Sequence, residues 1–491
     1  MVAPRPNHPR RATGGNESPR ERAFVKAREL QRRLFMTAKC DRERRFHALY
    51  DRIWRSDVLQ EAWERVRENK GAAGIDGQSL KQIEDQGVRP FLLELQELLK
   101  SGTYRPQPVR RVYIPKADGR QRPLGIPAVR DRVVQAAAKI ILEPIFEADF
   151  QDCSHGFRPR RSATDALEVI RLTGGRGHYH VVDADIQGFF DNIDQKLLLE
   201  MVAKRISDPR VLKLLRQWLE AGVMEEGKVS TATAGTPQGG VISPMLANVY
   251  LNEMDRTWTA KYAHLGQLVR YADDFVILCR TRAQAETALA RVREILTGLK
   301  LQLHPAKTRL VELGLGKEGF DFLGCHLRIV RSHFKRRNYL FRWPSPRAMK
   351  SIRQKVRDAT DRRRCAGMKD IREVIAEINP VLRGWGNYFR TGNASAKFHA
   401  VDRHVHRRLL KLLAQRGGQR KWKPGGRPFR PSQWPHQRFV NDHGLHQLLG
   451  TIRYPGVRTP HEKTIVKPYA GNPHVRFERG SQETEQARNR A

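Results

Sequence analysis

Two adjacent carboxylates interrupt an apolar stretch in the second half of the sequence. The runs Leu268–Tyr271 and Phe275–Leu278 are rich in Val, Ile, Phe and Tyr and predict two strands, joined by a tight turn at Ala272-Asp273-Asp274. Like charges held together are unfavourable unless a cation offsets them, and carboxylates are ligands of hard divalent cations. Because aspartate is also a common turn residue, this metal-site hypothesis needs support from other residues.

A second acidic strand precedes this hairpin. The apolar segment 179–186 contains Asp183 and Asp185, and an extended strand presents both side chains on the same side. Either residue is suited to join Asp273 and Asp274 around a metal ion. The spacing alone leaves the choice between Asp183 and Asp185 open.

Two further segments carry groups suited to phosphate chemistry. Strands at 109–116 and 121–127 flank a turn at 117–120, so we expect Lys116 and Arg122 to lie close together, where two cations suit the gripping of a triphosphate. Solvated surface charges are the plain alternative. The segment 236–244, Thr-Pro-Gln-Gly-Gly-Val-Ile-Ser-Pro, predicts a turn leading into a helix, with Ser243 as its N-cap and Pro244 at its first position.

Length and charge indicate a large nucleic-acid-associated protein. The 491 residues suffice for two or three domains, and 91 basic against 52 acidic residues give a formal net charge of +39, which favours an RNA or DNA partner. Five scattered cysteines without a Cys-x-x-Cys pair argue against zinc ribbons or a disulfide framework and fit a reducing compartment. No apolar run approaches the roughly 18 residues of a membrane span, and the basic N-terminus lacks a signal-peptide core. We therefore expect a cytoplasmic protein without a membrane partner.

The sequence beyond Pro344 predicts basic helices. One apolar stripe consists of Ile371, Val374, Ile375 and Ile378, and a second runs from Phe398 through Val401, Val405 and Leu409 to Leu412, with basic residues beside it. Such helices suit a bundle lying on nucleic acid. Between the stripes, residues 383–390 interleave aromatic side chains with arginine, which fits either stacking on bases or a packed corner of the core.

In their order along the chain, these motifs resemble those of a known family. From about residue 71 to 327 the sequence is similar to reverse transcriptases, and it resembles the branch encoded by group II introns. The segments that carry the resemblance are Tyr113-Ile114-Pro115-Lys116, residues 122–127 (Arg-Pro-Leu-Gly-Ile-Pro), residues 155–159 (His-Gly-Phe-Arg-Pro), residues 236–244 and Tyr271-Ala272-Asp273-Asp274.

The resemblance implies an α+β right-hand polymerase, whose fingers and palm contain antiparallel sheet and precede an α-helical thumb or maturase domain. The expected parts are a basic arm (1–45), an N-terminal extension with the first finger helices (46–108), fingers and palm (109–335), the helical thumb/maturase domain (344–416) and a basic DNA-binding tail (417–491). The paired cysteines of the endonuclease domain found in many members are absent from this sequence, so we expect the branch that lacks that domain.

The resemblance also implies roles for individual residues. The family's first catalytic aspartate begins the pattern Asp-Ile-x-x-x-Phe, which selects Asp185, so that Asp185, Asp273 and Asp274 hold two Mg²⁺ ions, for which Mn²⁺ is a substitute. The remaining implied roles are a steric gate against ribonucleotides (Phe190), contacts to the triphosphate (Lys116 and Arg122), a position under the incoming nucleotide (Gln238) and a proton donor to pyrophosphate (Lys307).

The expected partners are intron RNA as template, a DNA primer or target, and deoxynucleoside triphosphates. The expected activities are RNA-directed DNA synthesis and help in intron splicing, in the cytoplasm and associated with nucleoid or ribonucleoprotein. One alternative is a catalytically silent splicing factor on a relict polymerase fold, and another is a retron or diversity-generating reverse transcriptase. An RNA-dependent RNA polymerase is disfavoured by Phe190. The sequence leaves the intron, the DNA target and the oligomeric state open.

Overall fold

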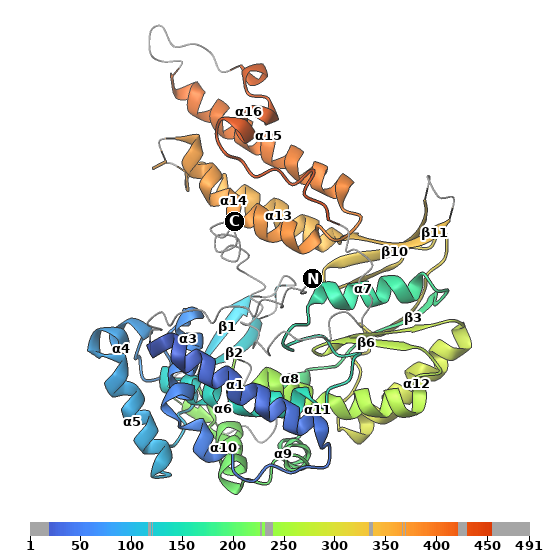
Figure 1. Cartoon of the computed structure of the whole chain (residues 1–491). Coiled ribbons are helices and arrows are strands. Elements are labelled where there is room, and N and C mark those ends of the chain that lie inside the picture. The colour runs from blue at the N-terminus through green and yellow to red at the C-terminus, as the bar shows by residue number, and fades with distance from the viewer. Residues whose placement is uncertain are drawn as a thin grey trace, which may run out of the picture.

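The protein is described from a computed structural model (Figure 1), and the description covers residues 19–115, 119, 121–225, 228–230, 239–332, 337–365, 367–368, 370–420 and 430–453. The fold is α+β, as predicted. Within the described ranges, no helix combines the length and the apolar character needed to span a bilayer.

A four-stranded antiparallel sheet with the order β6-β7-β3-β8, called the central sheet below, carries both acidic strands. Its strands are β3 (His180–Asp185), β6 (Gln267–Tyr271), β7 (Asp274–Cys279) and β8 (Arg309–Glu312). Both faces are covered: Phe275 and Ile277 point into one hydrophobic core, and Val276 and Leu278 into another. A strand buried on both faces is apolar along its length, so the acidic residues gather where β3 ends and β7 begins.

The first core is built largely from helices that pack around α6 (Val129–Glu147). This helix is buried on almost every side because α1 (Pro19–Cys40), α3 (Ser56–Glu68) and α11 (Ser243–Thr257) pack against it. Helix α12 (Arg282–Gly298), which begins at a capping box, covers β3 and β7. The shorter helices of this part are α2 (Tyr50–Ile53), α4 (Leu80–Gln86), α5 (Val88–Lys100), α8 (Phe189–Asn192), α9 (Gln195–Ala203), α10 (Pro209–Glu220) and the π-helix Trp258–Tyr262.

The expected hairpin at 109–127 belongs to a second sheet with the order β2-β1-β4-β5. Its strands are β1 (Val109–Pro115), β2 (Gln121–Ile126), β4 (Val223–Glu225) and β5 (Lys228–Ser230). A third sheet, β9 (Phe320–Phe322), β10 (Cys325–Arg331) and β11 (Asn338–Pro344), links the central sheet to the helices that follow. Helix α7 (Ala163–Gly174) packs against both β6 and β11.

The start of α11 differs from the prediction. Ile242, not Ser243, is the N-cap residue, and no side chain caps the helix. Ile242 already has helical dihedral angles (φ −87°, ψ −22°), and its carbonyl accepts hydrogen bonds from the backbone N–H groups of Met245 and Leu246. Ser243 is therefore already helical, and a helix can begin one residue earlier than its side chains indicate.

The last part is a helical domain, which lies at the top of Figure 1 in orange and red. It consists of α13 (Pro346–Ala359), α14 (Ile371–Phe389), α15 (Ser395–Arg420), the 3₁₀ turn Pro431–Gln433 and α16 (His436–Asn441). Both predicted apolar stripes are buried in its core. Trp385 packs 4.8 Å from the ring of Phe389 and 5.4 Å from that of Phe398, so the segment 383–390 forms a packed corner.

Residues 430–453 pack back onto this helical domain. Phe439, Leu445 and Leu448 are buried in its core, and the Asp402 carboxylate of α15 accepts hydrogen bonds from the backbone N–H groups of Leu448 (3.1 Å) and Leu449 (2.9 Å). This segment of the basic C-terminal range is thus an ordered strap against the helices.

Candidate active site

The hairpin that carries the paired aspartates is tighter than predicted. Tyr271 pairs with Asp274, so the turn consists only of Ala272 and Asp273, and Asp274 is the first residue of β7. Ala272 adopts φ +58°, a left-handed conformation that two-residue hairpin turns require and that costs a non-glycine residue conformational energy. The two carboxylates therefore leave the backbone at adjoining but different positions, one on the turn and one on a strand.

The register of the central sheet separates the two aspartates of β3. Asp185 lies directly opposite Asp274, and their carboxyl groups share a hydrogen bond. Asp183, two residues earlier, lies opposite Val276 of β7 and Arg309 of β8, and its carboxylate lies 2.9 Å from Nε of Arg309. The structure thus brings Asp185, and not Asp183, to the hairpin carboxylates.

Lys307 reaches the same place from the segment that follows α12. The backbone carbonyl of Asp185 accepts a hydrogen bond from His304 N–H (2.8 Å), which holds this segment along the end of β3. The Lys307 ammonium then lies 2.5 Å from Oδ2 of Asp185. A cation is therefore already present among the carboxylates.

The crowding of carboxylates perturbs Asp274. Burial of its carboxyl group is the main cause that raises the pKa of Asp274 to about 8, although the residue as a whole is exposed. The negative charge of Asp273 and a hydrogen bond that the protonated Asp274 carboxyl donates to Asp185 raise this pKa further. Within the described ranges, no three His, Cys, Asp or Glu side chains form a ready metal-binding cluster. The all-oxygen donor set and its mutual repulsion nevertheless fit a hard divalent cation.

The other predicted site residues are only partly described. Phe190 lies in the short helix α8, five residues after the end of β3. It is half-buried, with its ring edge-on to that of Phe189 at 5.3 Å. Lys116 and Gln238 lie outside the described residues. So does the side chain of Arg122, although its backbone pairs with Ile114 in the β1–β2 hairpin.

Comparison with known proteins identifies the family. Residues 114–327 match the model of reverse transcriptase (RNA-dependent DNA polymerase), and residues 349–426 match the maturase-specific domain of group II introns. Over 345 residues the chain is 37% identical to Protein YkfC of Escherichia coli K12, covering 62% of this chain and 89% of that protein. The chain belongs to the group II intron-encoded reverse transcriptases. It is an RNA-directed DNA polymerase, of a class that uses divalent metal ions and binds nucleic acid.

Two other relatives of this reverse transcriptase are named after introns. It is 41% identical over 214 residues to the group II intron-encoded protein LtrA of Lactococcus lactis. The matched residues cover 43% of this chain and 35% of LtrA. The chain is 28% identical over 415 residues to an uncharacterized 91 kDa protein in the cob intron of Schizosaccharomyces pombe, covering 69% of this chain and 50% of that protein.

Sequence reasoning missed the residue directly behind the aspartate turn of the reverse transcriptase. Arg270 of β6 is completely buried and forms an ion pair with Asp255 of α11, which is also completely buried. The available signal was a charged residue within an otherwise apolar strand, because such a side chain needs a buried partner. Its partner Asp255 lies 15 residues earlier, on α11, and nothing in the local sequence indicates that it is buried.

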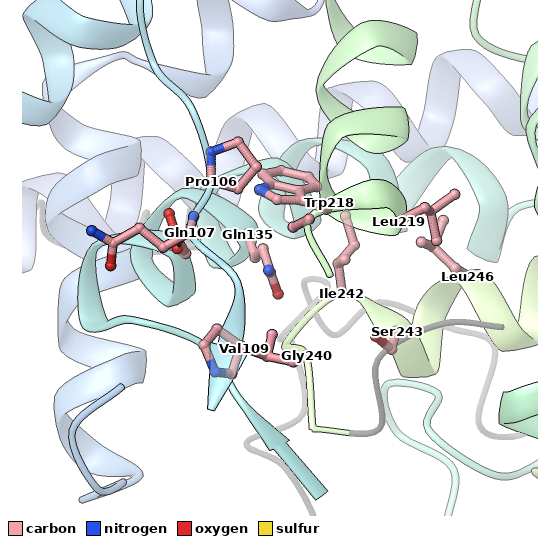
Figure 2. A pocket seen from close by; sticks show the side chains of 13 residues that line it. Pro106, Gln107, Val109, Gln135, Trp218, Leu219, Gly240, Ile242, Ser243 and Leu246 are labelled. Atoms are coloured by element: carbon pink, nitrogen blue, oxygen red, sulfur yellow. Dashed lines mark hydrogen bonds between the residues drawn. The ribbon is translucent and has the colours of Figure 1, made fainter. Parts of the chain in front are cut away.

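A small cavity lies between β1, α6, α10 and α11 (Figure 2). Its volume of about 20 Å³ suits a single water molecule. At its edge, Oε1 of Gln135 accepts a hydrogen bond from the backbone N–H of Val241 (2.9 Å). Helix α6 thereby anchors the chain three residues after Gln238.

Proposed function

We propose that this enzyme copies intron RNA into DNA at a site where Asp185, Asp273 and Asp274 hold two Mg²⁺ ions. The observation that carries the proposal is the direct cross-strand opposition of Asp185 and Asp274, with Asp273 on the adjoining turn. Two-metal phosphoryl transfer needs carboxylates that converge from separate elements. Here they come from the end of β3 and the start of β7.

Each side chain has a distinct task in this proposal. When bound, the ions activate the 3′-hydroxyl of the primer and neutralise the pyrophosphate that leaves. Asp185, whose carboxylate contacts Lys307, would serve as a metal ligand, and the Lys307 ammonium would then be available to donate a proton to the pyrophosphate. Lys116 and Arg122 bind the triphosphate, Gln238 lies under the incoming nucleotide, and Phe190 excludes a ribose 2′-hydroxyl.

We further propose that the helical domain binds the intron RNA during splicing. What supports this is the charge on its surface: α13 and α15 pack together, and both expose basic side chains, namely Arg347, Lys350, Arg353, Lys355, Arg403, Arg407 and Lys411. Such a face would track the phosphate backbone, and its binding would weaken with salt. The strap 430–453 is the described part of the proposed DNA-binding tail and packs against the same domain. We place the enzyme in the cytoplasm with its nucleic acids.

Primer extension with a matched pair of variants tests the polymerase site. Asp185→Asn removes one negative ligand and should reduce Mg²⁺-dependent extension of a DNA primer on an RNA template by at least about a thousandfold. Asp183→Asn, two residues away on the same strand, should leave extension close to wild type because Asp183 pairs with Arg309. Equal activity of wild type and Asp185→Asn would refute the assignment.

The alternative of a silent splicing factor makes a different forecast for the same proteins. Wild type would then promote intron splicing, yet no Mg²⁺ or Mn²⁺ concentration would yield primer extension. Filled aspartate positions at 185, 273 and 274 favour the polymerase.

A further inference from the structure

The guanidinium of Arg270 is fully committed inside the protein. Its Nε and Nη2 donate to the Asp255 carboxylate at 2.9 and 2.5 Å, and Nη2 also donates to Oγ of Ser154 at 2.8 Å. Its Nη1 donates to Oδ1 of Asn248 at 3.0 Å and to the backbone carbonyl of Ala272 at 2.9 Å. These contacts use all five N–H donors of the side chain.

The contact with Ala272 connects this buried group to the active-site turn. Ala272 is the residue with φ +58°, and its carbonyl immediately precedes Asp273. A strained turn persists only where its surroundings hold it. Nη1 of Arg270 holds that turn from inside the protein, directly behind the two hairpin carboxylates.

The segment 153–156 lies against Arg270 and is held to it by hydrogen bonds. Arg270 and this segment exchange backbone hydrogen bonds, from His155 N–H to the Arg270 carbonyl and from Arg270 N–H to the Cys153 carbonyl, both 2.8 Å. Nδ2 of Asn248 donates to the Gly156 carbonyl at 2.8 Å, so one asparagine contacts both the arginine and the segment. The turn therefore lies between a fixed guanidinium and a fixed backbone.

We propose that Arg270 is a positioning residue for DNA synthesis, which sets the metal-binding geometry of Asp273 and Asp274 through the Ala272 carbonyl. This inference rests on the proposed metal site. Stability alone accounts poorly for the arrangement, because a buried ion pair is often no more stabilising than well-packed apolar residues of the same volume. Apolar residues would fill the space, but they would not hold the carbonyl of the turn.

Substitution by lysine separates positioning from folding. Arg270→Lys keeps a positive charge for Asp255, but a single ammonium cannot span from Asp255 to Ala272 as the planar guanidinium does. We expect kcat to fall, or the half-saturating Mg²⁺ concentration to rise, by roughly 10- to 100-fold, as when residues that orient metal ligands are changed. The affinity for primer–template should stay within about twofold of wild type, because the nucleic-acid surface is untouched.

A second buried arginine provides the matched control. Arg205 is 6% exposed and pairs with Asp149 at 3.0 Å, and it binds the carbonyl of Ala38 at 2.9 Å, at the C-terminal end of α1. Arg205→Lys should lower the melting temperature because it weakens a buried ion pair, but it should leave the half-saturating Mg²⁺ concentration unchanged. A purely structural role for Arg270 predicts the same pattern for both variants.

The outcomes separate this inference from the proposed site. If folded Arg270→Lys has wild-type kcat and Mg²⁺ dependence while Asp273→Asn is inactive, the positioning role is refuted and the metal site stands. If Asp273→Asn is active, the proposed site itself fails. Should Arg270→Lys not fold, the double variant Arg270→Met/Asp255→Leu decides, since it replaces the buried ion pair by apolar residues and removes the contact with the Ala272 carbonyl. A raised Mg²⁺ requirement or a lowered kcat supports the role, and wild-type behaviour overturns it.

Discussion

Replacing Gly156 by alanine should displace the active-site turn by a distance that follows from the structure. A Cβ atom at Gly156 would lie 2.3 Å from the backbone nitrogen of Ala272, 2.9 Å from the carbonyl carbon of Tyr271 and 3.1 Å from Cα of Ala272. All three neighbours are backbone atoms, so no flexible side chain can move aside. Restoring an ordinary contact of 3.4 Å to the nitrogen requires a shift of about 1.1 Å (3.4 minus 2.3).

Such a shift is large for catalysis and moderate for stability. A misplacement of about 1 Å at a reacting centre costs on the order of 100-fold in rate, whereas overpacking a buried site costs about 1–3 kcal/mol of unfolding free energy. We therefore expect Gly156→Ala to remain folded with a lowered melting temperature. Its rate of single-nucleotide addition should fall roughly a hundredfold, with primer–template affinity nearly unchanged.

Single-turnover primer extension on an RNA template at saturating deoxynucleotide measures this effect, with thermal denaturation alongside. Gly298→Ala is the control, because Gly298 ends α12 and a Cβ there meets nothing within 4 Å. That variant should keep the wild-type rate and be as stable as wild type or slightly more so. A wild-type rate for folded Gly156→Ala would refute the idea that close contact with this segment holds the turn.

Three further outcomes are expected. The raised pKa of Asp274 contributes stability that is fully present below the unfolded-state pKa of 3.8 and is lost as the pH rises through about 8. The melting temperature of the metal-free wild type should therefore fall over that pH range by more than that of Asp274→Asn, and Mg²⁺ should restore the wild-type melting temperature. Lys307→Ala removes the cation that competes for Asp185, so the half-saturating Mg²⁺ concentration should fall while the rate of nucleotide addition drops, as a metal titration of primer extension would show. Phe190→Ala should raise the ratio of ribonucleotide to deoxynucleotide incorporation by roughly tenfold or more, and an unchanged ratio would remove Phe190 from the gate.

Local sequence patterns predicted the secondary structure around the site well. The hairpin at 268–279, the hairpin at 109–127 and both apolar stripes of the helical domain are present because strand and helix periodicity are properties of short windows. The errors lie at element ends: Asp274 belongs to the strand and not to the turn, and the N-cap of α11 is Ile242 and not Ser243. Ends depend on which backbone groups find partners, and the side chains of a window only bias that choice.

The interpretation of the segment 383–390 shows where composition becomes ambiguous. Alternating aromatic residues and arginine fit both base stacking and core packing. The choice depends on whether another element covers the aromatic rings, and here Phe398 of α15 lies against Trp385. Likewise, the irregular composition after residue 417 does not reveal that residues 430–453 pack against α14 and α15. The backbone of this strap is held by hydrogen bonds to the side chains of Asn379 and Asp402, which lie on distant elements of the chain.

By itself the sequence determined the types of residue available for chemistry, the strands and helices that carry them, the basic character of the protein and, through its resemblance, its family. Tertiary structure alone decided which groups meet. The register of β3 between β7 and β8 places Asp185 opposite Asp274 and Asp183 beside Arg309, and the packing of α11 behind β6 gives Arg270 its partner. These contacts join residues far apart in the chain, and their geometry follows from strand pairing and helix packing that no single window of sequence encodes.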